Sequence, residues 1–513
     1  RIIVTSALLF AGHPAYAAAT NIDVLYQQHC ASCHGANRLG GMGPALLPEN
    51  LKRLRKKKAI KVIAQGRAAT QMPAFTEKLS TKDIQSLVKL IYTPLPNIPK
   101  WDINDIKSSH LTHYKSTNLG DKPVFKADML NLFIVVELGD HHATLLDGDK
   151  FEPIHRFKTR FALHGGPKYS PAGRYVYFAS RDGWISKYDI YNLKTVVEIR
   201  AGINTRNLAV SGDGKSVLVG NYLPHNLVVL DAKNLKPVKV IPVKDKKGKS
   251  SRVSAVYTAT PRNSFIAALK DIPEVWEIFY NDKHEPVYNG LLHDYRQGEC
   301  VEEKSSFPIR RIELDDYLDD FQFDQSYTHL MGAGRNKKNG QVIDLNIGRK
   351  VADLELTGLP HLGSGITWKY KGKMIMATPN IKKSEISIID MTTWKTIKKI
   401  KTLGPGFFMR SHENSRYAWA DVFFGPNKEA VHVIDKQSLE IVKTLRPSPG
   451  KNAAHVEFDR YGKHVLLSVW DMDGELIIYD ADTLKEIKRL PMKKPSGKYN
   501  VYNKINRSAG TSH

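Results

Sequence analysis

Hydrophobic residues recur with two different periods along this chain. The first part carries a helical stripe that follows a capping segment at residues 80–83. This stripe is formed by Ile84, Leu87, Val88 and Ile91, at positions i, i+3, i+4 and i+7. Segments 23–33 and 48–66 are predicted to be two further helices. From residue 130 onward, short β-branched and aromatic runs alternate with turn residues, which is typical of strands. The pattern predicts a small all-α domain followed by a larger all-β domain.

Prolines mark the boundary between these domains. Pro94, Pro96 and Pro99 lie within seven residues of one another. Proline cannot donate a backbone hydrogen bond, so this segment ends a helix and favours an extended linker. We expect the first domain at residues 18–92, the linker at 93–125 and the second domain at 126–513.

The second domain is predicted to be a repeat. An aspartate ends the third strand of each recognisable unit, and its successive spacings are 42, 42, 113, 46, 45 and 45 residues. The wide gap holds one more unit, around residues 275–278, and an insertion near residues 290–320 that we expect to be a surface excursion. Eight units of this length predict an eight-bladed β-propeller. We expect residues 498–503 to return as the inner strand of the first blade, which closes the ring and leaves no long strand edge unpaired. The repeated aspartates are Asp147, Asp189, Asp231, Asp344, Asp390, Asp435 and Asp480.

The first residues have the pattern of an export signal. An apolar run at residues 2–12 is followed by Ala15, Tyr16 and Ala17, a small-x-small cleavage site. The run is too short to cross a bilayer, which needs about 20 apolar residues. We therefore expect residues 1–17 to be a partial signal peptide, the mature protein to lie in the periplasm, and no segment to span the membrane.

The chain is strongly basic, with a formal net charge of +24. Export to the periplasm makes nucleic acid an unsuitable partner, so we expect an acidic electron-transfer protein or a ligand with several carboxylates. The basic run at residues 52–58 fits either a solvated helix face or a docking surface.

The segment from Cys30 to His34 carries the clearest chemical motif. Two thiols three positions apart can form thioether bonds to haem, and the adjacent imidazole of His34 can ligate the iron. A zinc site would need a second cysteine pair, and a thioredoxin-like motif would need a βαβ unit. The chain has no second cysteine pair, since Cys300 is the one other cysteine. The segments around the motif are predicted to be helices and not a βαβ unit. The sequence therefore predicts covalent haem c on Cys30 and Cys33.

Three helices and this motif resemble a class I cytochrome c. In that family the second iron ligand is a methionine ahead of the last helix, commonly followed by proline. Met72, followed by Pro73, matches this pattern, and Met42 is the competing candidate.

In a propeller, residues that begin the inner strands converge at one mouth of the central axis. Imidazole suits iron ligation and base catalysis, guanidinium pairs with carboxylates, and phenol donates hydrogen bonds. A flat, metal-bearing, carboxylate-rich ligand would use all of these groups, so we expect a second tetrapyrrole at this mouth. The candidates are His164, Arg206, His361, Phe408, Arg410, His455 and Tyr499.

The whole mature chain resembles the cytochrome cd1 family, in which a cytochrome c domain precedes an eight-bladed propeller that holds haem d1. Segments 161–164, 180–183, 468–470 and 497–503 carry this resemblance. It implies that His164 is the proximal ligand of the d1 iron and that Arg181 and Arg206 lie near its carboxylates. From its place at the mouth, we expect Arg410 to bind this cofactor as well. Nitrite reductases of this family use two distal histidines. One matches His361, but we align the other with Phe323, which cannot donate a proton.

Segments 359–365, 404–414 and 507–513 resemble a second branch, the NirN-type dihydro-haem d1 dehydrogenases of haem d1 biosynthesis. This implies that the bound tetrapyrrole is the substrate, that a propionate side chain is oxidised to acrylate, and that electrons leave through haem c to a periplasmic acceptor. It also implies a distal iron ligand at His455 and catalytic roles for His361 and Tyr499. A cytochrome cd1 nitrite reductase is the expected receiver of finished haem d1. Two alternatives stay open, namely that the chain is itself a nitrite reductase or that it is a haem d1 carrier.

Overall fold

The computed structural model describes residues 21–41, 43–51, 54–66, 72–284, 286–289, 301–302, 305–334, 340–356 and 358–506. The chain divides into two compact units, with the division between Leu95 and Pro96. The predicted signal peptide, Met42, Cys300 and residues 507–513 lie outside the described residues. Among the described residues, no helix is long and apolar enough to cross a membrane.

The first unit is helical. Helix α5 begins where the sequence predicts, because Ser80 Oγ accepts the backbone N–H of Asp83 while the Asp83 carboxylate accepts the N–H of Ser80. The predicted stripe of this helix is buried against Tyr26 of the first helix and Phe75. The helices of this unit are α1 (Asn21–His29), α2 (Ala31–His34), α3 (Pro48–Leu51), α4 (Lys56–Gln65) and α5 (Thr81–Ile91).

The segment predicted as one helix at 48–66 forms two helices, α3 and α4. Arg55 is extended, with φ −68° and ψ 144°, and it precedes the first residue of α4. Like charges three and four residues apart oppose a continuous helix, and residues 55–58 are all basic and exposed. Residues 55–58 give α4 an exposed, positively charged start.

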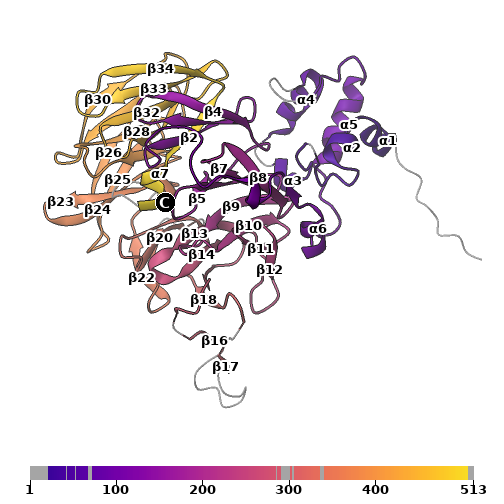
Figure 1. The fold of residues 1–513 in the computed structure, drawn as a ribbon, viewed down its shortest axis with the longest axis horizontal. Helices are drawn as coiled ribbons and strands as arrows, with labels where there is room; N and C mark the ends of the chain where they lie inside the picture. Colours follow the sequence, from indigo (N-terminus) through magenta and orange to yellow (C-terminus); the bar gives the residue numbers. More distant parts are fainter. Residues whose placement is uncertain are drawn as a thin grey trace, which may run out of the picture. The chain divides into compact units, whose positions relative to one another are not determined.

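The second unit is an eight-bladed β-propeller, as predicted. The described residues form eight sheets of four or five strands, each sheet antiparallel, and a separate two-stranded hairpin. Figure 1 shows these sheets as separate groups of strands, in colours that follow the sequence from purple to yellow. Each sheet is one blade, and neighbouring blades bury apolar side chains against each other, as Trp419 of blade 7 does with Phe458 of blade 8.

The strands of blades 1 to 4 are as follows. Blade 1 contains β35 (Pro495–Asn500), β2 (Leu132–Glu137), β3 (His142–Asp147) and β4 (Glu152–Lys158); blade 2 contains β5 (Lys168–Tyr169), β6 (Tyr175–Ala179), β7 (Trp184–Asp189), β8 (Lys194–Arg200) and β1 (Leu111–Thr112). Blade 3 contains β9 (Asn204–Val210), β10 (Ser216–Leu223), β11 (Asn226–Asp231) and β12 (Pro237–Pro242); blade 4 contains β13 (Val253–Ala259), β14 (Ser264–Leu269), β15 (Glu274–Phe279) and β18 (Ile309–Glu313).

Blades 5 to 8 follow in chain order. Blade 5 contains β19 (Leu318–Phe323), β20 (His329–Gly334), β21 (Gly340–Asp344) and β22 (Arg349–Leu354); blade 6 contains β23 (Ile366–Tyr370), β24 (Lys373–Pro379), β25 (Glu385–Asp390) and β26 (Thr396–Lys401). Blade 7 contains β27 (Met409–Ser411), β28 (Tyr417–Asp421), β29 (Val431–Asp435) and β30 (Glu440–Leu445); blade 8 contains β31 (Ala453–Phe458), β32 (His464–Val469), β33 (Gly474–Asp480) and β34 (Glu486–Met492). Short helices η2 (Thr260–Arg262), η3 (Leu362–Ser364) and α7 (Val501–Asn506) lie between or after these strands.

The repeated aspartate has a structural role in the turn after each third strand. Asp390 ends β25, and its Oδ1 accepts the N–H groups of Thr392 at 2.7 Å and Thr393 at 3.1 Å. Asp147 binds the N–H groups two and three residues ahead in the same way. An aspartate that binds its own following backbone favours a tight turn, which explains the regular spacing in the sequence.

The two ends of the propeller sequence meet in blade 1. Strand β35 pairs with β2, so that Tyr499 lies opposite Ile134, and this confirms the predicted closure of the ring. Residues from Val501 onward form α7 instead of continuing the strand. Figure 1 shows this yellow helix beside the purple strands β2 and β5. Closure therefore places Tyr499 beside residues more than 300 positions earlier.

Residues after the proline-rich segment pack on the propeller. Asp102 caps α6 (Ile103–Ser108), and Ile106 of this helix is buried in a core shared by blades 2 and 3. Trp101 Nε1 donates to the Arg200 carbonyl at 2.9 Å, and β1 pairs with β8. A short helix, η1 (Ser116–Asn118), follows. Much of the segment expected to be a linker at 93–125 is thus part of the second unit.

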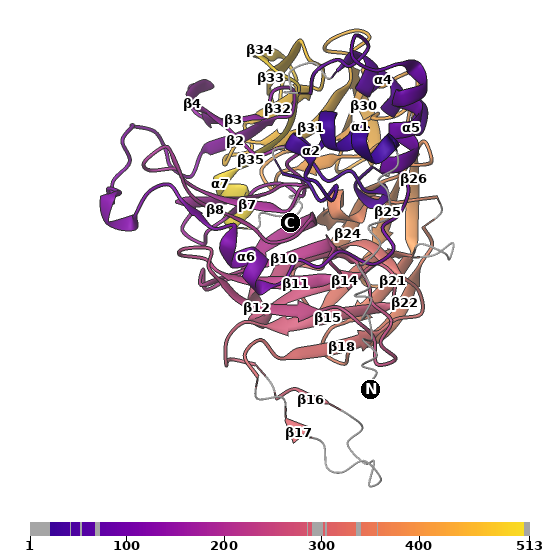
Figure 2. The same cartoon turned by 90° about the vertical axis from the view of Figure 1, so that its right-hand side faces the viewer.

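The insertion lies between β15 and β18, and it begins and ends earlier in the chain than predicted. Its described part includes the hairpin β16 (Tyr288–Asn289) and β17 (Val301–Glu302), which projects beyond the blades in Figures 1 and 2. Residues 309–313 and 318–323 are blade strands instead of a surface excursion. The acidic residues at 319 and 320 misled the prediction, because acidic residues usually mark a solvated surface.

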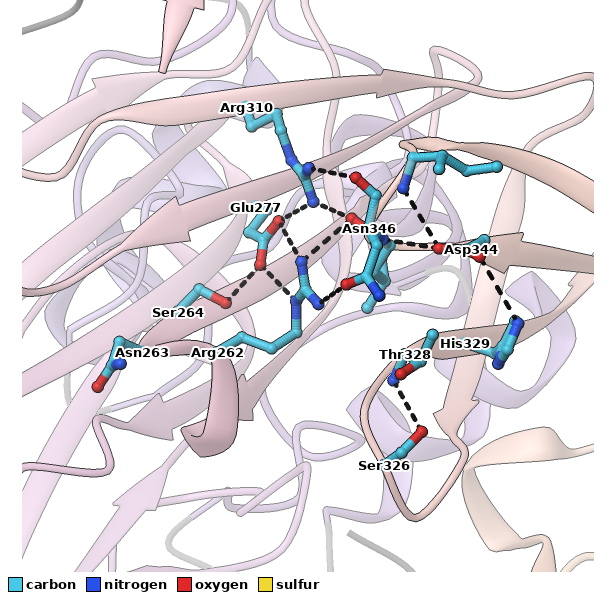
Figure 3. Close-up of polar contacts among 12 residues, drawn as sticks. Arg262, Asn263, Ser264, Glu277, Arg310, Ser326, Thr328, His329, Asp344 and Asn346 are labelled. Atoms are coloured by element: carbon cyan, nitrogen blue, oxygen red, sulfur yellow. Dashed lines mark hydrogen bonds and ion pairs between the residues drawn. The ribbon is translucent and has the colours of Figure 1, made fainter. Parts of the chain in front are cut away.

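A buried carboxylate keeps blades 4 and 5 together beside this insertion (Figure 3). Glu277 is fully buried and accepts hydrogen bonds from Ser264 Oγ at 2.9 Å and Arg262 Nε at 2.8 Å. Arg310 of β18 also pairs with Glu277, and Arg262 donates to Asn346 Oδ1 of blade 5 at 2.7 Å. Because β18 is bound in this way, the insertion leaves the blade intact.

Candidate functional site

The cysteine and histidine motif of the first unit occupies one turn. Cys30 precedes α2, which contains Cys33 and His34. His34 is buried, and its Nδ1 donates to the Pro44 carbonyl at 2.7 Å. A Cβ on Gly43 would lie 2.7 Å from the imidazole ring, so glycine is needed for this close approach. The ring is therefore fixed in one orientation. Because Nδ1 carries the hydrogen, Nε2 has the free lone pair that an iron ligand requires.

The electrostatics of this turn do not favour a redox dithiol. Burial, with a smaller contribution from Cys33, raises the pKa of the Cys30 thiol to about 11. Thioredoxin-like cysteines need a lowered pKa. Burial also lowers the pKa of His34, which keeps its imidazole neutral and able to bind metal. These donors fit covalent haem c.

Met72 packs against the same hydrophobic core as Cys30. It follows α4 and precedes α5, as a second axial ligand of a class I cytochrome c would. Since Met42 lies outside the described residues, the assignment of Met72 stays a prediction.

His164 lies at the start of blade 2, ahead of β5. Its Nδ1 lies 2.7 Å from the Arg206 carbonyl, while Nε2 accepts from Arg181 Nη2 at 2.8 Å and Arg206 Nη1 at 2.9 Å. A guanidinium can only donate, so Nε2 carries the lone pair and Nδ1 carries the hydrogen. The structure thus brings these three predicted residues together, with two cations beside the nitrogen that would face a metal.

His361 begins blade 6, one residue before η3. Its Nδ1 donates to the Phe407 carbonyl at 2.7 Å, and its ring lies 4.1 Å from that of Phe407, measured between centroids. Burial lowers its pKa, and the nearby Asp320 only partly opposes this effect. His361 is therefore a neutral imidazole whose Nε2 carries the lone pair.

Asp320 of β19 was missed by the sequence analysis. It is buried, and its carboxylate accepts hydrogen bonds from Tyr257 Oη and from the N–H of Gly363, each at 3.0 Å. Its Oδ2 lies 3.6 Å from His361 Nε2. A shift in strand register between residues 318 and 321 changes the direction of these side chains, and the sequence carries no signal for it.

Phe323, which we aligned with a distal histidine, does not lie at the mouth. It is the last residue of β19 and packs in a hydrophobic core, 4.7 Å from the ring of Tyr327. The polar residue of blade 5 that faces the mouth is Asp320. Phe323 therefore provides no proton donor at the mouth.

His455 lies in a bulge of β31. Its φ of 55° is in the left-handed region, and the pairing with β32 shifts there. Bulges with this geometry re-aim a side chain and are common at functional sites. Among the described residues, no group hydrogen-bonds to its buried Nδ1. Burial, assisted by the cations of Lys498 and Arg410, holds its pKa well below the usual value.

Tyr499 lies beside His455, with 5.3 Å between ring centroids in an edge-to-face arrangement. Gly166 and Gly497 allow the phenol to lie close to the backbone, since a Cβ on either would be within 2.8 Å of its side chain. Burial raises the pKa of Tyr499 to about 12, although Arg410 opposes this shift. The phenol therefore stays protonated at neutral pH.

The predicted residues do not all make the contacts expected of them. Phe408 joins the two sides of the mouth, with its ring 6.0 Å from His361 and 4.6 Å from His455. No direct contact joins the predicted catalytic pair His361 and Tyr499 in the part of the chain described. Arg410 is fully buried and donates to the Met409 carbonyl at 2.9 Å, so it is less accessible than Arg181 and Arg206.

Comparisons with known proteins agree with both units. The chain matches the Cytochrome D1 heme domain over residues 127–504 and the Cytochrome C oxidase, cbb3-type, subunit III family over residues 17–91. It is 25% identical over 537 residues to Nitrite reductase of Stutzerimonas stutzeri, which covers 94% of this chain and 92% of that relative.

Another relative is similar over its entire length. The chain is 54% identical over 513 residues to Dihydro-heme d1 dehydrogenase of Pseudomonas aeruginosa, covering 100% of both proteins. The solved structure of Dihydro-heme d1 dehydrogenase NirN in complex with DHE superposes with a TM-score of 0.88 at 55% identity, covering 94% of this chain and 99% of that one. The chain therefore belongs to the family of proteins that join a cytochrome c domain to a cytochrome d1 haem domain.

Proposed function

We propose that this chain is a periplasmic dihydro-haem d1 dehydrogenase, which oxidises a propionate side chain of the haem d1 precursor to acrylate. The observation that carries the proposal is the full-length similarity to the dehydrogenase of Pseudomonas aeruginosa, which includes the cytochrome c unit and the propeller. A carrier that performs no redox chemistry would have no use for the first unit.

The reaction converts –CH2–CH2–COO− into –CH=CH–COO− and removes two electrons and two protons. Haem c, when bound, supplies a one-electron acceptor that passes each electron onward. Cys30 and Cys33 would attach it, and His34 with Met72 would ligate its iron. The residues of the propeller must then bind the substrate and take its protons.

Hydrogen bonds to the histidines favour His164 and His361 as ligands of the substrate iron. A ligating histidine almost always donates its other ring N–H to a carbonyl or carboxylate, which fixes the ring and its tautomer. His34, His164 and His361 each have Nδ1 at 2.7 Å from a backbone carbonyl. Among the residues that the structure describes, none forms this hydrogen bond with His455. We therefore exchange the roles that the resemblance implied for His361 and His455.

His455 and Tyr499 are then the proton-handling pair. A neutral imidazole can accept a proton at pH 7, and the lowered pKa of His455 keeps it neutral before reaction. The protonated phenol of Tyr499 can take a second proton only as it releases its own, so it acts as a relay. Their edge-to-face contact supports a joint role in removing both protons of a single side chain.

Arg181 and Arg206 are proposed to bind substrate carboxylates. Guanidinium pairs with carboxylate through two parallel hydrogen bonds. Burial opposes the charge of Arg206, but Tyr222 and Asp320 more than offset it and raise its pKa. Both cations lie at His164 Nε2 and would turn from it when the substrate iron occupies that position.

The predicted export signal and the positive net charge indicate where the protein acts and which electron acceptor it binds. The apolar start of the chain supports a periplasmic location, and the basic surface supports an acidic electron acceptor. The product would pass to a cytochrome cd1 nitrite reductase, which uses haem d1.

The test compares His361→Ala with His455→Ala in haem c-loaded protein. We expect His361→Ala to weaken precursor binding and change the absorption spectrum of its iron, because a ligand is lost. We expect His455→Ala to leave binding and spectrum intact and to slow single-turnover conversion by about 100-fold or more. His464→Gln is a matched control at the start of β32, where His464 pairs with Asp459, and should change neither.

Two results would contradict the proposal. If His455→Ala changes the iron spectrum while His361→Ala only slows conversion, the roles are those that the sequence resemblance implied. If the wild type binds the precursor and never converts it with an electron acceptor present, the chain is not a dehydrogenase.

A further inference from the structure

The loop that carries the carbonyl partner of His361 is held by a buried aspartate. Asp421 is the last residue of β28 and lies in the interior. Its Oδ1 accepts the N–H groups of Phe407 at 2.8 Å and Phe408 at 3.0 Å. Its Oδ2 accepts the N–H of His455 at 3.3 Å. The roles proposed for the mouth residues do not use this carboxylate.

Asp421 differs from the aspartates that repeat along the propeller. Those end third strands and bind the backbone two and three residues ahead, as Asp435 of the same blade does with Gln437 and Ser438. Asp421 ends a second strand, and its three donors lie 13, 14 and 34 positions away in the sequence. It therefore does not shape a local turn, and it joins the start of blade 7 to the inner strand of blade 8.

One peptide group connects this carboxylate to His361. The N–H of Phe408 and the carbonyl of Phe407 belong to the same peptide. The N–H donates to Asp421, and the carbonyl accepts from His361 Nδ1 at 2.7 Å. Hydrogen bonds in such a chain polarise one another, so a carboxylate at one end strengthens the bond at the other. Burial raises the pKa of Asp421 to about 6, although its three N–H donors oppose this shift, so the carboxylate is largely charged at pH 7.

The other oxygen of Asp421 holds the bulge at His455 from one side. The pairing of β31 with β32 skips His455, whose φ is 55°, so the strand register does not fix this residue. On the other side of the bulge, Lys498 Nζ donates to the Ala454 carbonyl at 3.5 Å. A single carboxylate therefore binds the backbone on both the His361 side and the His455 side of the mouth.

We propose that Asp421 is a positioning residue of the tetrapyrrole site, which acts on His361 through the 407–408 peptide. This rests on the proposed function, in which His361 is a ligand of the substrate iron. The partner of a ligating imidazole orients the ring and raises its basicity as a ligand. Here the Phe407 carbonyl is the direct partner, and Asp421 makes that carbonyl a stronger acceptor. Loss of the negative charge should weaken iron ligation while the side chains that face the substrate stay the same.

The test is Asp421→Asn in haem c-loaded protein. The amide oxygen can still accept the Phe407 and Phe408 N–H groups, but it carries no charge, and the amide nitrogen cannot accept the His455 N–H. An anaerobic titration with the dihydro-haem d1 precursor should show about tenfold lower affinity and a changed absorption spectrum of the substrate iron. The haem c spectrum should stay unchanged. Asp421→Ser, a smaller neutral replacement, should show the same two changes and serves as the test if the asparagine variant does not fold.

A double-mutant cycle separates an effect through His361 from a general loss of structure. In the His361→Ala background, Asp421→Asn should not change the spectrum of the substrate iron any further, because the ligand on which it acts is absent. The loss of affinity in that background should also be smaller than in the wild type. Asp435→Asn is the matched control, since it changes a buried carboxylate of the same blade that also accepts two backbone N–H groups. It should change neither affinity nor spectrum.

The contradicting outcomes separate this proposal from the function. Wild-type affinity and spectrum in both Asp421 variants, while His361→Ala changes both, would show that the carboxylate does not act on His361. So would a loss of affinity from Asp421→Asn that is the same size with and without His361. A wild type that binds the precursor and never converts it contradicts the proposed function instead.

Discussion

The two units hold their candidate iron ligands in different ways. In the first unit, His34 lies one residue after Cys33, in the same turn. In the propeller, His164 and His361 come from blades 2 and 6. The three histidines proposed as ligands nevertheless share one local feature, an Nδ1 bound to a backbone carbonyl at 2.7 Å. This shared contact is the reason that we propose these histidines as ligands.

The largest expected effect comes from removing the proposed proximal ligand of the propeller. His164→Ala should lower the affinity for the precursor by more than about 100-fold, which is the upper range for losing a residue that only supports a ligand. The haem c spectrum should stay unchanged, because His164 belongs to the other unit. An anaerobic titration followed by absorption measures both. Retained affinity would show that His164 is not the proximal ligand.

Tyr499→Phe should have the next largest effect. It removes the phenol oxygen and keeps the ring that contacts His455, so precursor binding should persist while single-turnover conversion slows by about 100-fold. Rapid mixing of bound precursor with an electron acceptor measures the rate. Normal conversion would exclude Tyr499 from proton transfer.

Asp320→Ala should have an intermediate effect on binding. Asp320 holds the His361 loop through the Gly363 N–H, so its loss should weaken precursor affinity about tenfold, as for other second-shell partners. Asp320→Asn keeps an acceptor and should restore part of the affinity. Gly363→Ala tests the same contact, since its Cβ would lie 2.1 Å from Asp320 Oδ2. Gly363→Ala should lower precursor affinity more in the wild type than in the Asp320→Ala variant, which lacks the carboxylate that the new Cβ would meet. Equal losses of affinity in the two backgrounds would contradict the contact.

The smallest effect concerns a histidine of the propeller that is not a ligand. His432 is buried and accepts the Leu403 N–H at Nε2, and burial lowers its pKa to about 4. Its folded pKa is below its unfolded value, so its contribution to stability is present above pH of about 6.5 and is lost as pH falls toward 4. His432→Gln should reduce this loss, by on the order of 2 kcal/mol, in urea unfolding at several pH values. An unchanged pH dependence would contradict the assignment.

Local signals explain most of what the sequence could predict. The Ser80 capping box starts α5, and the repeated aspartates end the third strands and mark the blades. The motif at Cys30 is likewise contained in one turn. Each of these features depends on neighbouring residues, so the sequence alone contains the information.

The parts that could not be predicted depend on contacts between distant segments. The register shift near Asp320 brings its carboxylate close to His361, and no pattern in the sequence signals this shift. The contact between His455 and Tyr499 requires the closed ring. Sequence spacing cannot show which histidine has a carbonyl partner, and the roles of His361 and His455 depend on that difference.

The central claim is that the propeller mouth oxidises a tetrapyrrole side chain and that haem c takes its electrons. Oxidised protein mixed anaerobically with the precursor tests this most directly, with the spectra of haem c and of the substrate followed together. The account predicts that reduced haem c appears at the same rate as product, and that an added one-electron acceptor allows two electrons to leave per molecule converted. Product formation while haem c stays oxidised would contradict it.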